Sequence, residues 1–327
     1  MNVQIPRFLD LKTQILDGIK KKGGWINCHA HLDRAYTLTP ELYAQANARR
    51  EEKWSINADL RKNSTVSQIY DRMAMATERL LEQGVVATGS FIDVDKDVQD
   101  KAIKAAQKLR EAYKGQMIFR FQNQSSYGIL NPEGRKWFDE AVQFVDIVGG
   151  LLKADQGKEA EHLDILLGTA NELNKMVQIH VDENNISTEH ETAIVAQKVI
   201  EHKLQGRVTG VHGISINARP KEERERIYHL MKKADLMMIA CPVSWINARR
   251  NEELTPTHNP VTPLDELDQH GIVVGLGLDN IHDVFMPYND ADMWTDLRML
   301  FEMNRFYDVG KIIDIATDNG RKVLGIA

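Results

Sequence analysis

Asn27-Cys-His-Ala-His31 is the stretch around which the rest of the chain can be organised. It ends an apolar run, Gly24–Cys28, that has the character of a short buried strand. Because side chains alternate along a strand, the imidazoles of His29 and His31 point to the same face. Two neutral imidazoles side by side supply half of a zinc or iron site, although a His-x-His pair alone is a weak signal.

Seven more runs of the same kind follow, each separated from the next by a segment of helical period. This alternation is typical of βα units, and eight parallel strands are the number that closes into a barrel. We therefore predict an α/β fold, a (β/α)₈ TIM barrel that occupies residues 1–327 as a single domain. The expected strands are Gly24–Cys28, Val85–Ile92, Met117–Gln122, Val145–Leu152, Met176–Val181, Arg207–Val211, Leu236–Ala240 and Ile272–Gly277.

Helix signals lie between these strands. Thr65-Val-Ser-Gln68 and Thr188-Glu-His-Glu191 both have the capping-box pattern, so each predicts the start of a helix. A helix within residues 1–22 is expected before the first strand, because apolar residues recur there at helical spacing. Residues 37–63 are expected to form a long loop over the active site, and such loops usually act as lids or substrate-binding walls. Further helices are expected within Asp97–Lys114, Glu159–Asn174, Lys221–Lys233 and Ala291–Phe306.

Composition restricts the class of protein. The 327 residues carry a formal net charge of −6, and no Lys/Arg cluster suggests binding to nucleic acid or an anionic membrane. No apolar run approaches the roughly 20 residues of a membrane span, and the first ten residues lack the apolar segment of a signal peptide. The only two cysteines, Cys28 and Cys241, fit a reducing compartment, so the cytoplasm is the expected location. The oligomeric state stays open, and a homo-oligomer is compatible with the sequence.

Three more polar residues stand at the ends of other expected strands. His180 ends the fifth strand, His212 the sixth and Asp279 the eighth. Since barrel active sites lie at the carboxyl ends of the strands, four imidazoles and a carboxylate are expected to meet at one mouth. Buried polar groups need partners, and a shared metal ion supplies them. The histidines within helices are instead expected to face solvent: His162, His190, His202 and His229.

The order of these residues resembles that of the amidohydrolase superfamily. The residues around them resemble the cytosine deaminase branch, which includes the N-isopropylammelide aminohydrolases. The resemblance covers nearly the whole chain. A small β-sandwich that is usual in this superfamily is expected to be missing here. The matching stretches are His29–Asp33, Ile179–Glu183, Arg207–His212 and Gly277–Phe285.

The resemblance implies a mononuclear site and assigns roles to its residues. His29, His31, His180 and Asp279 would hold one divalent metal ion, zinc or iron, with a water completing the shell. Asp279 would also accept a proton from that water. Glu183 would carry the proton to a ring nitrogen or to the leaving group, and His212 would hydrogen-bond the attacking oxygen or the tetrahedral centre. These are the acid–base and electrostatic roles that such a hydrolysis needs.

Several positions depart from the cytosine deaminase pattern and leave the substrate open. Lys153, after the fourth strand, replaces a histidine; it would bind an anionic group of the substrate, be carboxylated to bridge a second metal ion, or pair with Asp155. Asn280 replaces a second aspartate next to the metal aspartate. The other candidates for substrate binding are Gln122, Gln124 and Ser126 after the third strand, Trp245 and Arg249 after the seventh, and Trp54 in the long loop.

The predicted function is hydrolytic deamination of a small nitrogen heterocycle, cytosine-like or triazine-like. One alternative is hydrolysis of a cyclic amide, as in dihydroorotase or hydantoinase, which carboxylation of Lys153 would favour. A second alternative is a catalytically silent barrel that only binds a ligand. The complete set of expected metal ligands argues against the silent barrel. The expected partner is a small-molecule heterocycle, with no nucleic acid and no membrane.

Overall fold

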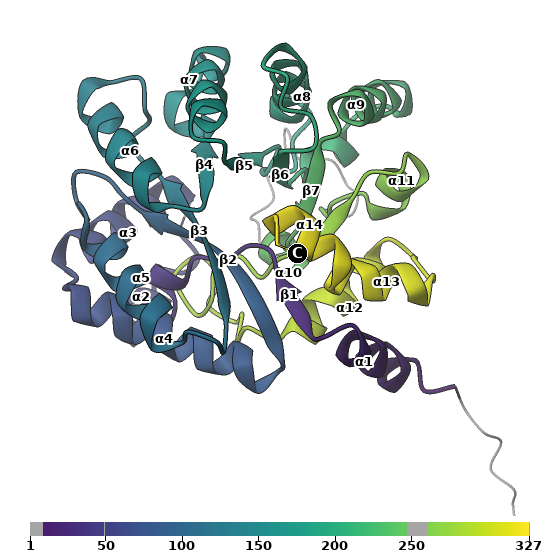
Figure 1. Ribbon diagram of the computed structural model, residues 1–327, viewed down its shortest axis with the longest axis horizontal. Helices are drawn as coiled ribbons and strands as arrows, with labels where there is room; N and C mark the ends of the chain where they lie inside the picture. The colour runs from purple at the N-terminus through teal and green to yellow at the C-terminus, as the bar shows by residue number, and fades with distance from the viewer. Residues whose placement is uncertain (1–8, 49, 247–259, 327) are drawn as a thin grey trace, which may run out of the picture.

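Eight parallel strands follow one another around a single sheet in chain order (Figure 1). The computed structural model describes residues 9–48, 50–246 and 260–326. Every expected strand is present, and no strand end differs from its prediction by more than two residues. The strands are β1 (Trp25–Asn27), β2 (Val85–Asp93), β3 (Ile118–Gln124), β4 (Ile147–Leu151), β5 (Met176–Val181), β6 (Val208–His212), β7 (Met237–Ala240) and β8 (Val274–Leu276).

The first and last strands meet and close the barrel. The amide of Cys28 donates to the carbonyl of Leu276 at 2.7 Å, and the amide of Leu278 donates to the carbonyl of His29 at 2.9 Å. Ala30 and Asp279 form a further parallel bridge just beyond these strands. The fold is therefore a (β/α)₈ barrel, as the alternation of segments predicted.

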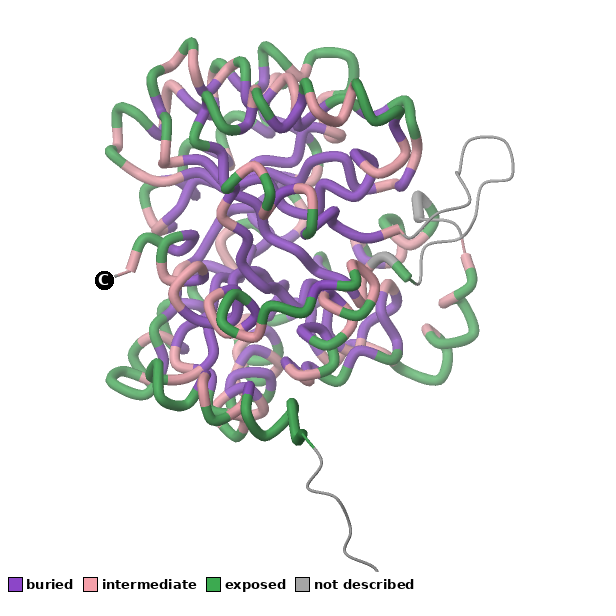
Figure 2. Tube along the Cα trace, turned by 90° about the vertical axis from the view of Figure 1, so that its right-hand side faces the viewer, coloured by how far each residue is buried: buried purple, intermediate pink, exposed green. Residues whose placement is uncertain are grey.

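Amphipathic helices surround the sheet and bury their apolar faces against it (Figures 1 and 2). The Thr65 capping box is confirmed: the Thr65 hydroxyl accepts from the Gln68 amide at 3.2 Å, and the Thr65 amide donates to Gln68 Oε1 at 2.9 Å. The outer helices are α4 (Val66–Glu82), α5 (Lys101–Ala112), α6 (Pro132–Phe144), α7 (Glu159–Glu172), α8 (Glu191–Glu201), α9 (Lys221–Ala234), α11 (Leu264–Gln269), α12 (Met293–Met303) and α13 (Val309–Ala316).

Helix α14 (Asp318–Leu324) lies across the end of the barrel where the strands begin. Its residues Val323 and Leu324 form one apolar cluster with Ile26, Ile147 and Ile239 from the strands. This packing fills the barrel interior at that end, so the opposite end, where the strands finish, is left to form a site.

The segment after β1 is more helical than expected. Residues 37–63 were predicted as a long loop, but they contain α2 (Pro40–Tyr43) and α3 (Arg50–Asn63). The helix expected within residues 1–22 is α1 (Leu11–Lys21), with the side chain of Asp10 capping its first turn. No helix in the described ranges combines the length and apolar character needed to cross a membrane.

Two local predictions were wrong. Thr188 does not cap a helix: α8 begins at Glu191, whose carboxylate accepts from the Asp182 amide at 2.6 Å, while its own amide donates to Asp182 Oδ1 at 2.9 Å. The Glu191 side chain is thus drawn inward to the end of β5. His162 does not face solvent either; it is buried, with Nδ1 at 2.8 Å from Asp155 Oδ2.

Candidate active site

Four imidazoles and one carboxylate lie together where the strands end. The ring centroid of His29 is 5.0 Å from that of His31, 5.0 Å from that of His180 and 5.7 Å from that of His212. Asp279 Oδ1 lies 3.4 Å from His29 Nε2 and 3.2 Å from His31 Nε2. These five side chains are brought together from β1, β5, β6 and β8, as the mouth of a barrel requires.

The backbone turns sharply at two of these residues. His212 ends β6 with φ 85° and Asp279 follows β8 with φ 62°, both in the left-handed region that residues other than glycine rarely adopt. Such strain persists where the surroundings enforce it, and it is concentrated at functional sites. The hydroxyl of Ser244, in α10 (Pro242–Ile246), also donates to Asp279 Oδ2 and helps to hold the carboxylate.

The protonation states suit a cation. Burial lowers the pKa of His31 and His212 well below the usual range of histidine, and it lowers the pKa of His180 to about 4. Burial alone would raise the pKa of Asp279, but hydrogen bonds from His29 and His31 outweigh it and hold the pKa well below its usual range. His31, His180 and His212 are therefore neutral beside an ionised carboxylate, and such groups are donors for a divalent metal ion.

The buried side chain of His29 also indicates a metal ion at this position. The side chain of His29 is fully buried; its Nδ1 has no hydrogen-bond partner within the described part of the chain, and its Nε2 has only Asp279 Oδ1, at the long distance of 3.4 Å. An unpaired buried polar group is costly unless an ion or water satisfies it. Ligand atoms of His29, His31 and Asp279 lie within 4.8 Å of one another, as do those of His29, His180 and His212. These residues fit one metal ion, and both zinc and iron accept such donors.

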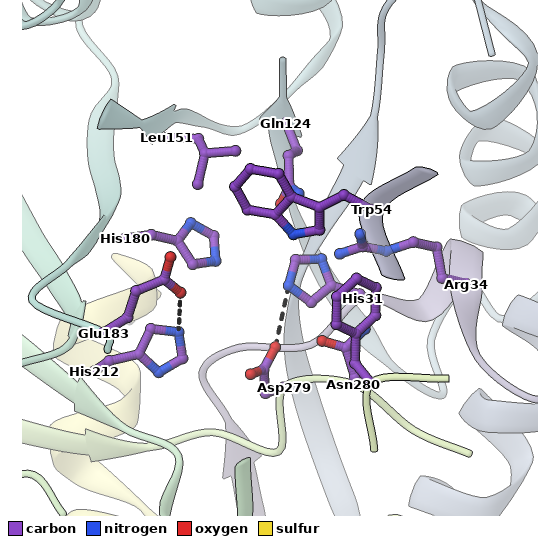
Figure 3. Close-up of a pocket in the computed structure, with 11 residues that line it drawn as sticks. His31, Arg34, Trp54, Gln124, Leu151, His180, Glu183, His212, Asp279 and Asn280 are labelled. Atoms are coloured by element: carbon purple, nitrogen blue, oxygen red, sulfur yellow. Dashed lines mark ion pairs between the residues drawn. The ribbon is translucent and has the colours of Figure 1, made fainter. Parts of the chain in front are cut away.

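Glu183 faces this cluster from the loop after β5 (Figure 3). Its Oε2 lies 3.9 Å from His212 Nε2, and its side chain is almost entirely buried. A carboxylate beside neutral imidazoles at the wall of a pocket is well situated to move a proton to or from a bound molecule.

Lys153 has partners that the sequence did not suggest. Its Nζ lies 2.9 Å from Glu183 Oε1 and 2.8 Å from Glu189 Oε1. The predicted alternative of a pair with Asp155 is wrong, because Asp155 binds His162 and the amide of Ile129 instead. Lys153 is not among the described residues that line the pocket. Two neighbouring carboxylates would repel a carboxylated, negatively charged lysine at this position.

A pocket opens above the cluster and contains about 390 Å³ of empty space, counted out to its mouth. Figure 3 shows Trp54 of α3 over the imidazoles, with Arg34 and Gln124 beside it. This size suits a small planar molecule. The pocket is lined by His31, Arg34, Trp54, Gln124, Leu151, His180, Glu183, His212, Asp279, Asn280 and Phe285.

The other residues that were predicted to bind substrate differ in whether they line the pocket. Gln122 is buried below the pocket wall, and its amide atoms have no hydrogen-bond partner among described residues. Ser126 points to Arg61, whose Nη1 donates to its hydroxyl at 2.6 Å. Asn280 lines the pocket and donates its side-chain amide to Asp283. The side chain of Trp245 and the whole of Arg249 lie outside the described part of the structure.

Sequence reasoning missed three residues of the pocket wall. Arg34 lies in the 3₁₀ turn Leu32–Arg34, three positions after His31, and this closeness to a strand end was a usable signal. Leu151 ends β4, and Phe285 lies in the loop after β8. Both are apolar, and no periodic pattern in the sequence marks either of them as a pocket residue. Their placement depends on how the loops fold over the mouth.

Known sequences match most of this chain. The sequence profile of the Amidohydrolase family matches residues 23–327. An uncharacterised protein of Haemophilus influenzae is 45% identical over 262 residues, which cover 78% of this chain and 94% of that protein. The N-isopropylammelide isopropyl amidohydrolase of Pseudomonas sp. (strain ADP) is 26% identical, over 97% of this chain and 79% of that protein.

Solved structures share the fold. The 5-methylcytosine deaminase of Klebsiella pneumoniae, liganded with 5-fluorocytosine, superposes with a TM-score of 0.85 at 21% identity, over 92% of this chain and 74% of that one. The N-isopropylammelide isopropylaminohydrolase of Burkholderia multivorans has a TM-score of 0.76 at 18% identity, over 92% and 74%. With its barrel, its cluster of ligands and the profile match over most of its length, this chain belongs to the amidohydrolase family.

Proposed function

We propose that this protein hydrolyses the exocyclic C–N bond of a small nitrogen heterocycle, a pyrimidine or a triazine, and releases ammonia. Water adds to the ring carbon, the amino group leaves as ammonia, and an oxo group takes its place. The observation that carries the proposal is the buried cluster of His29, His31, His180, His212 and Asp279, which offers metal ligands beside a pocket that Glu183 also lines. Membership of the amidohydrolase family supports hydrolysis of a C–N bond.

His29, His31, His180 and Asp279 would hold one divalent ion, zinc or iron. When bound there, such an ion acidifies water toward neutral pH and polarises the substrate. The neutral imidazoles of His31 and His180 and the charge of Asp279 favour this occupancy. A single ion is proposed because Lys153 is engaged by two carboxylates instead of bridging a second ion.

The chain's own residues would then move the protons. Asp279 accepts a proton from the attacking water, since its carboxylate is ionised and lies at the pocket floor. Glu183 carries one proton of the attacking water to the ring nitrogen, and the proton that Asp279 accepts from the same oxygen then passes to the amino group, which leaves as ammonia while the carbonyl forms. His212 hydrogen-bonds the oxygen as it adds to the ring carbon, which stabilises the charge that develops in the transition state.

The pocket wall favours a planar, polar ring. Trp54 supplies an aromatic face on which a heterocycle can stack, and Phe285 adds a second apolar surface. Gln124 offers a buried amide whose oxygen has no hydrogen-bond partner in the described structure. Arg34 and Asn280 bring hydrogen-bond donors to the same wall, where they would bind ring oxo groups.

The relatives support this class of substrate over the alternatives. One relative is named for N-isopropylammelide and one solved structure carries 5-fluorocytosine, so both kinds of ring occur among similar proteins. Hydrolysis of a cyclic amide by a carboxylated lysine fits less well, because Lys153 is already paired with Glu183 and Glu189. A silent binding barrel fits less well too, since every acid–base group is present. The free, buried cysteines Cys28 and Cys241 favour action in the reducing cytoplasm.

Ammonia release tests the proposal. The substrates are cytosine, isocytosine, ammelide and carboxylated pyrimidines, given to the wild-type protein and to Glu183→Gln. We expect one of these rings to release ammonia, and we expect the variant to be slower by about 10²–10⁴-fold, the usual contribution of a general acid–base. No ammonia from any ring, or equal rates for both proteins, would overturn the assignment.

A further inference from the structure

A second group of metal-ligand side chains lies on the outside of the barrel, between α9 and α11 (Figure 1). Glu225 and His229 stand one turn apart on α9, and His270 caps the end of α11. One ligand atom from each lies within 4.8 Å of the other two. This Glu225–His229–His270 cluster shares no residue with the site at the barrel mouth.

Both rings of the cluster are oriented by backbone carbonyls. His229 Nδ1 lies 2.7 Å from the carbonyl oxygen of Glu225, and His270 Nδ1 lies 2.8 Å from the carbonyl oxygen of Glu266. A ring that donates Nδ1–H to a carbonyl carries its lone pair on Nε2, and metal-binding histidines are commonly oriented in this way. The Nε2 atoms of both rings can therefore act as ligands.

Glu225 brings the third ligand to the same point. Its Oε2 lies 2.8 Å from His270 Nε2, and the ring centroids of His229 and His270 are 5.5 Å apart at 74°. This contact already places a carboxylate oxygen and a ring nitrogen at one point. A divalent ion would bind both atoms in place of their hydrogen bond, because metal binding requires deprotonated ligands.

The scaffold beneath the cluster is already fixed. Arg224 donates two hydrogen bonds to Glu266, at 2.8 and 2.7 Å, and the Tyr228 hydroxyl donates to the same carboxylate at 2.5 Å. These contacts join α9 to α11 directly. Sites built on rigid elements hold their ligands more accurately than sites on loops. Little rearrangement is then needed for an ion to bind.

We propose that Glu225, His229 and His270 bind a divalent ion of the Zn²⁺ class and thereby fasten α9 to α11. Two imidazoles and one carboxylate suit zinc, and water fills the remaining position. The cluster is partly exposed, so the ion enters from solvent. The site stabilises the outer ring of helices and takes no part in the reaction at the barrel mouth.

The test is the zinc content of the full-length protein after equilibrium dialysis against the same free Zn²⁺ concentration at neutral pH. His229→Ala and Glu225→Gln remove one ligand each from partly exposed helix positions. His202→Ala is the matched control: His202 also pairs with a helix carboxylate, Asp164 at 2.8 Å, but it is in none of the three-ligand groups within the described structure.

We expect the wild-type protein and His202→Ala to bind one zinc ion more per chain than His229→Ala and Glu225→Gln. We also expect added Zn²⁺ to raise the thermal midpoint of the wild-type protein more than that of either ligand variant. Equal zinc content in all four proteins would overturn the proposal. The comparison measures no activity, and ions at the barrel mouth contribute equally to all four proteins, so its outcome is independent of the proposed function.

Discussion

Lys153 Nζ lies 2.9 Å from Glu183 Oε1 and 2.8 Å from Glu189 Oε1, so one ammonium group joins two carboxylates beside the pocket. Glu189 is held in turn by the Ser215 hydroxyl at 2.5 Å and by the Asn184 amide at 2.8 Å. Both carboxylates are almost completely buried. We infer that this series of contacts fixes the side chain of Glu183 at the position from which it moves protons.

Replacing Lys153 with Met should therefore damage both catalysis and stability. The variant leaves two buried carboxylates without their cation, and removing one partner of a buried pair costs about 3–5 kcal/mol of folding free energy. We expect kcat to fall within the about 10²–10⁴-fold range that a general acid–base contributes. Steady-state kinetics and urea denaturation measure the two effects.

Lys153→Arg is the control for that experiment, because it keeps the positive charge. It should recover part of kcat and most of the stability, while the metal content stays that of the wild-type protein in both variants. Wild-type kcat in Lys153→Met would show that the ion pair does not position Glu183.

Variants of Asp279 and His212 should distinguish loss of metal binding from loss of catalysis. Asp279→Ala removes a ligand and should lose both the bound metal ion and the activity. His212→Asn removes a group that is proposed to bind the attacking oxygen, so the metal should remain while kcat falls about 10²–10³-fold. Metal analysis beside kinetics distinguishes them, and loss of metal from His212→Asn would assign His212 to the ligands instead.

Trp54 should act on substrate binding. Stacking of a base on an aromatic side chain contributes about 1–3 kcal/mol, so Trp54→Ala should raise KM by about 5- to 150-fold. The metal content should not change. Tyr307→Ala is the control, because Tyr307 is 75% exposed and does not line the pocket. If Trp54→Ala had the KM of the control, the helix α3 would not be a wall of the substrate site.

Glu191 should make stability depend on pH. Burial raises the pKa of Glu191 to about 8, although Lys153 opposes the shift. In the unfolded chain this carboxyl ionises near its ordinary value, so the folded state retains a proton that the unfolded state releases. The stability from this group is complete below the unfolded pKa and is lost as the pH rises through the folded pKa.

Glu191→Gln removes this titration and keeps an acceptor for the Asp182 amide. Between about pH 5 and pH 8 the free energy of unfolding of Glu191→Gln should fall less than that of the wild-type protein. The difference between the two falls should be on the order of a few kcal/mol. Glu201→Gln, at an exposed position of α8, is the control. Parallel curves for the wild type and Glu191→Gln would mean that Glu191 is ionised in the folded state throughout this range.

The strands could be predicted because their signal is local. β5 begins and ends where the sequence predicted, since Met176–Val181 is a mainly apolar run between polar turns. The ends of β4 and β8 differ by one or two residues, because a run of apolar residues does not show where the hydrogen-bonded ladder stops. Closure of the barrel followed from the number of strands.

The convergence of polar residues could also be foreseen. His180, His212 and Asp279 each stand at the end of an expected strand, and parallel strands finish at one edge of a sheet. Their closeness to His29 and His31 could therefore be predicted from the sequence alone. The partners of Lys153 could not be foreseen, because Glu183 and Glu189 come from the loop after another strand. Thr188 misled for the same reason: its capping-box pattern is local, whereas Glu191 is bound by Asp182 at the end of β5.

Metal-dependent deamination at the barrel mouth is tested most directly by measuring metal content and ammonia release on one preparation, with Asp279→Ala beside the wild type. The difference between the two proteins counts the ions at the mouth and leaves out any that the Glu225–His229–His270 cluster binds. We predict a difference of one ion per chain, together with ammonia from one pyrimidine or triazine that Asp279→Ala does not release. A difference of two ions, with no ammonia from any of these rings, would contradict the account and favour hydrolysis of a cyclic amide.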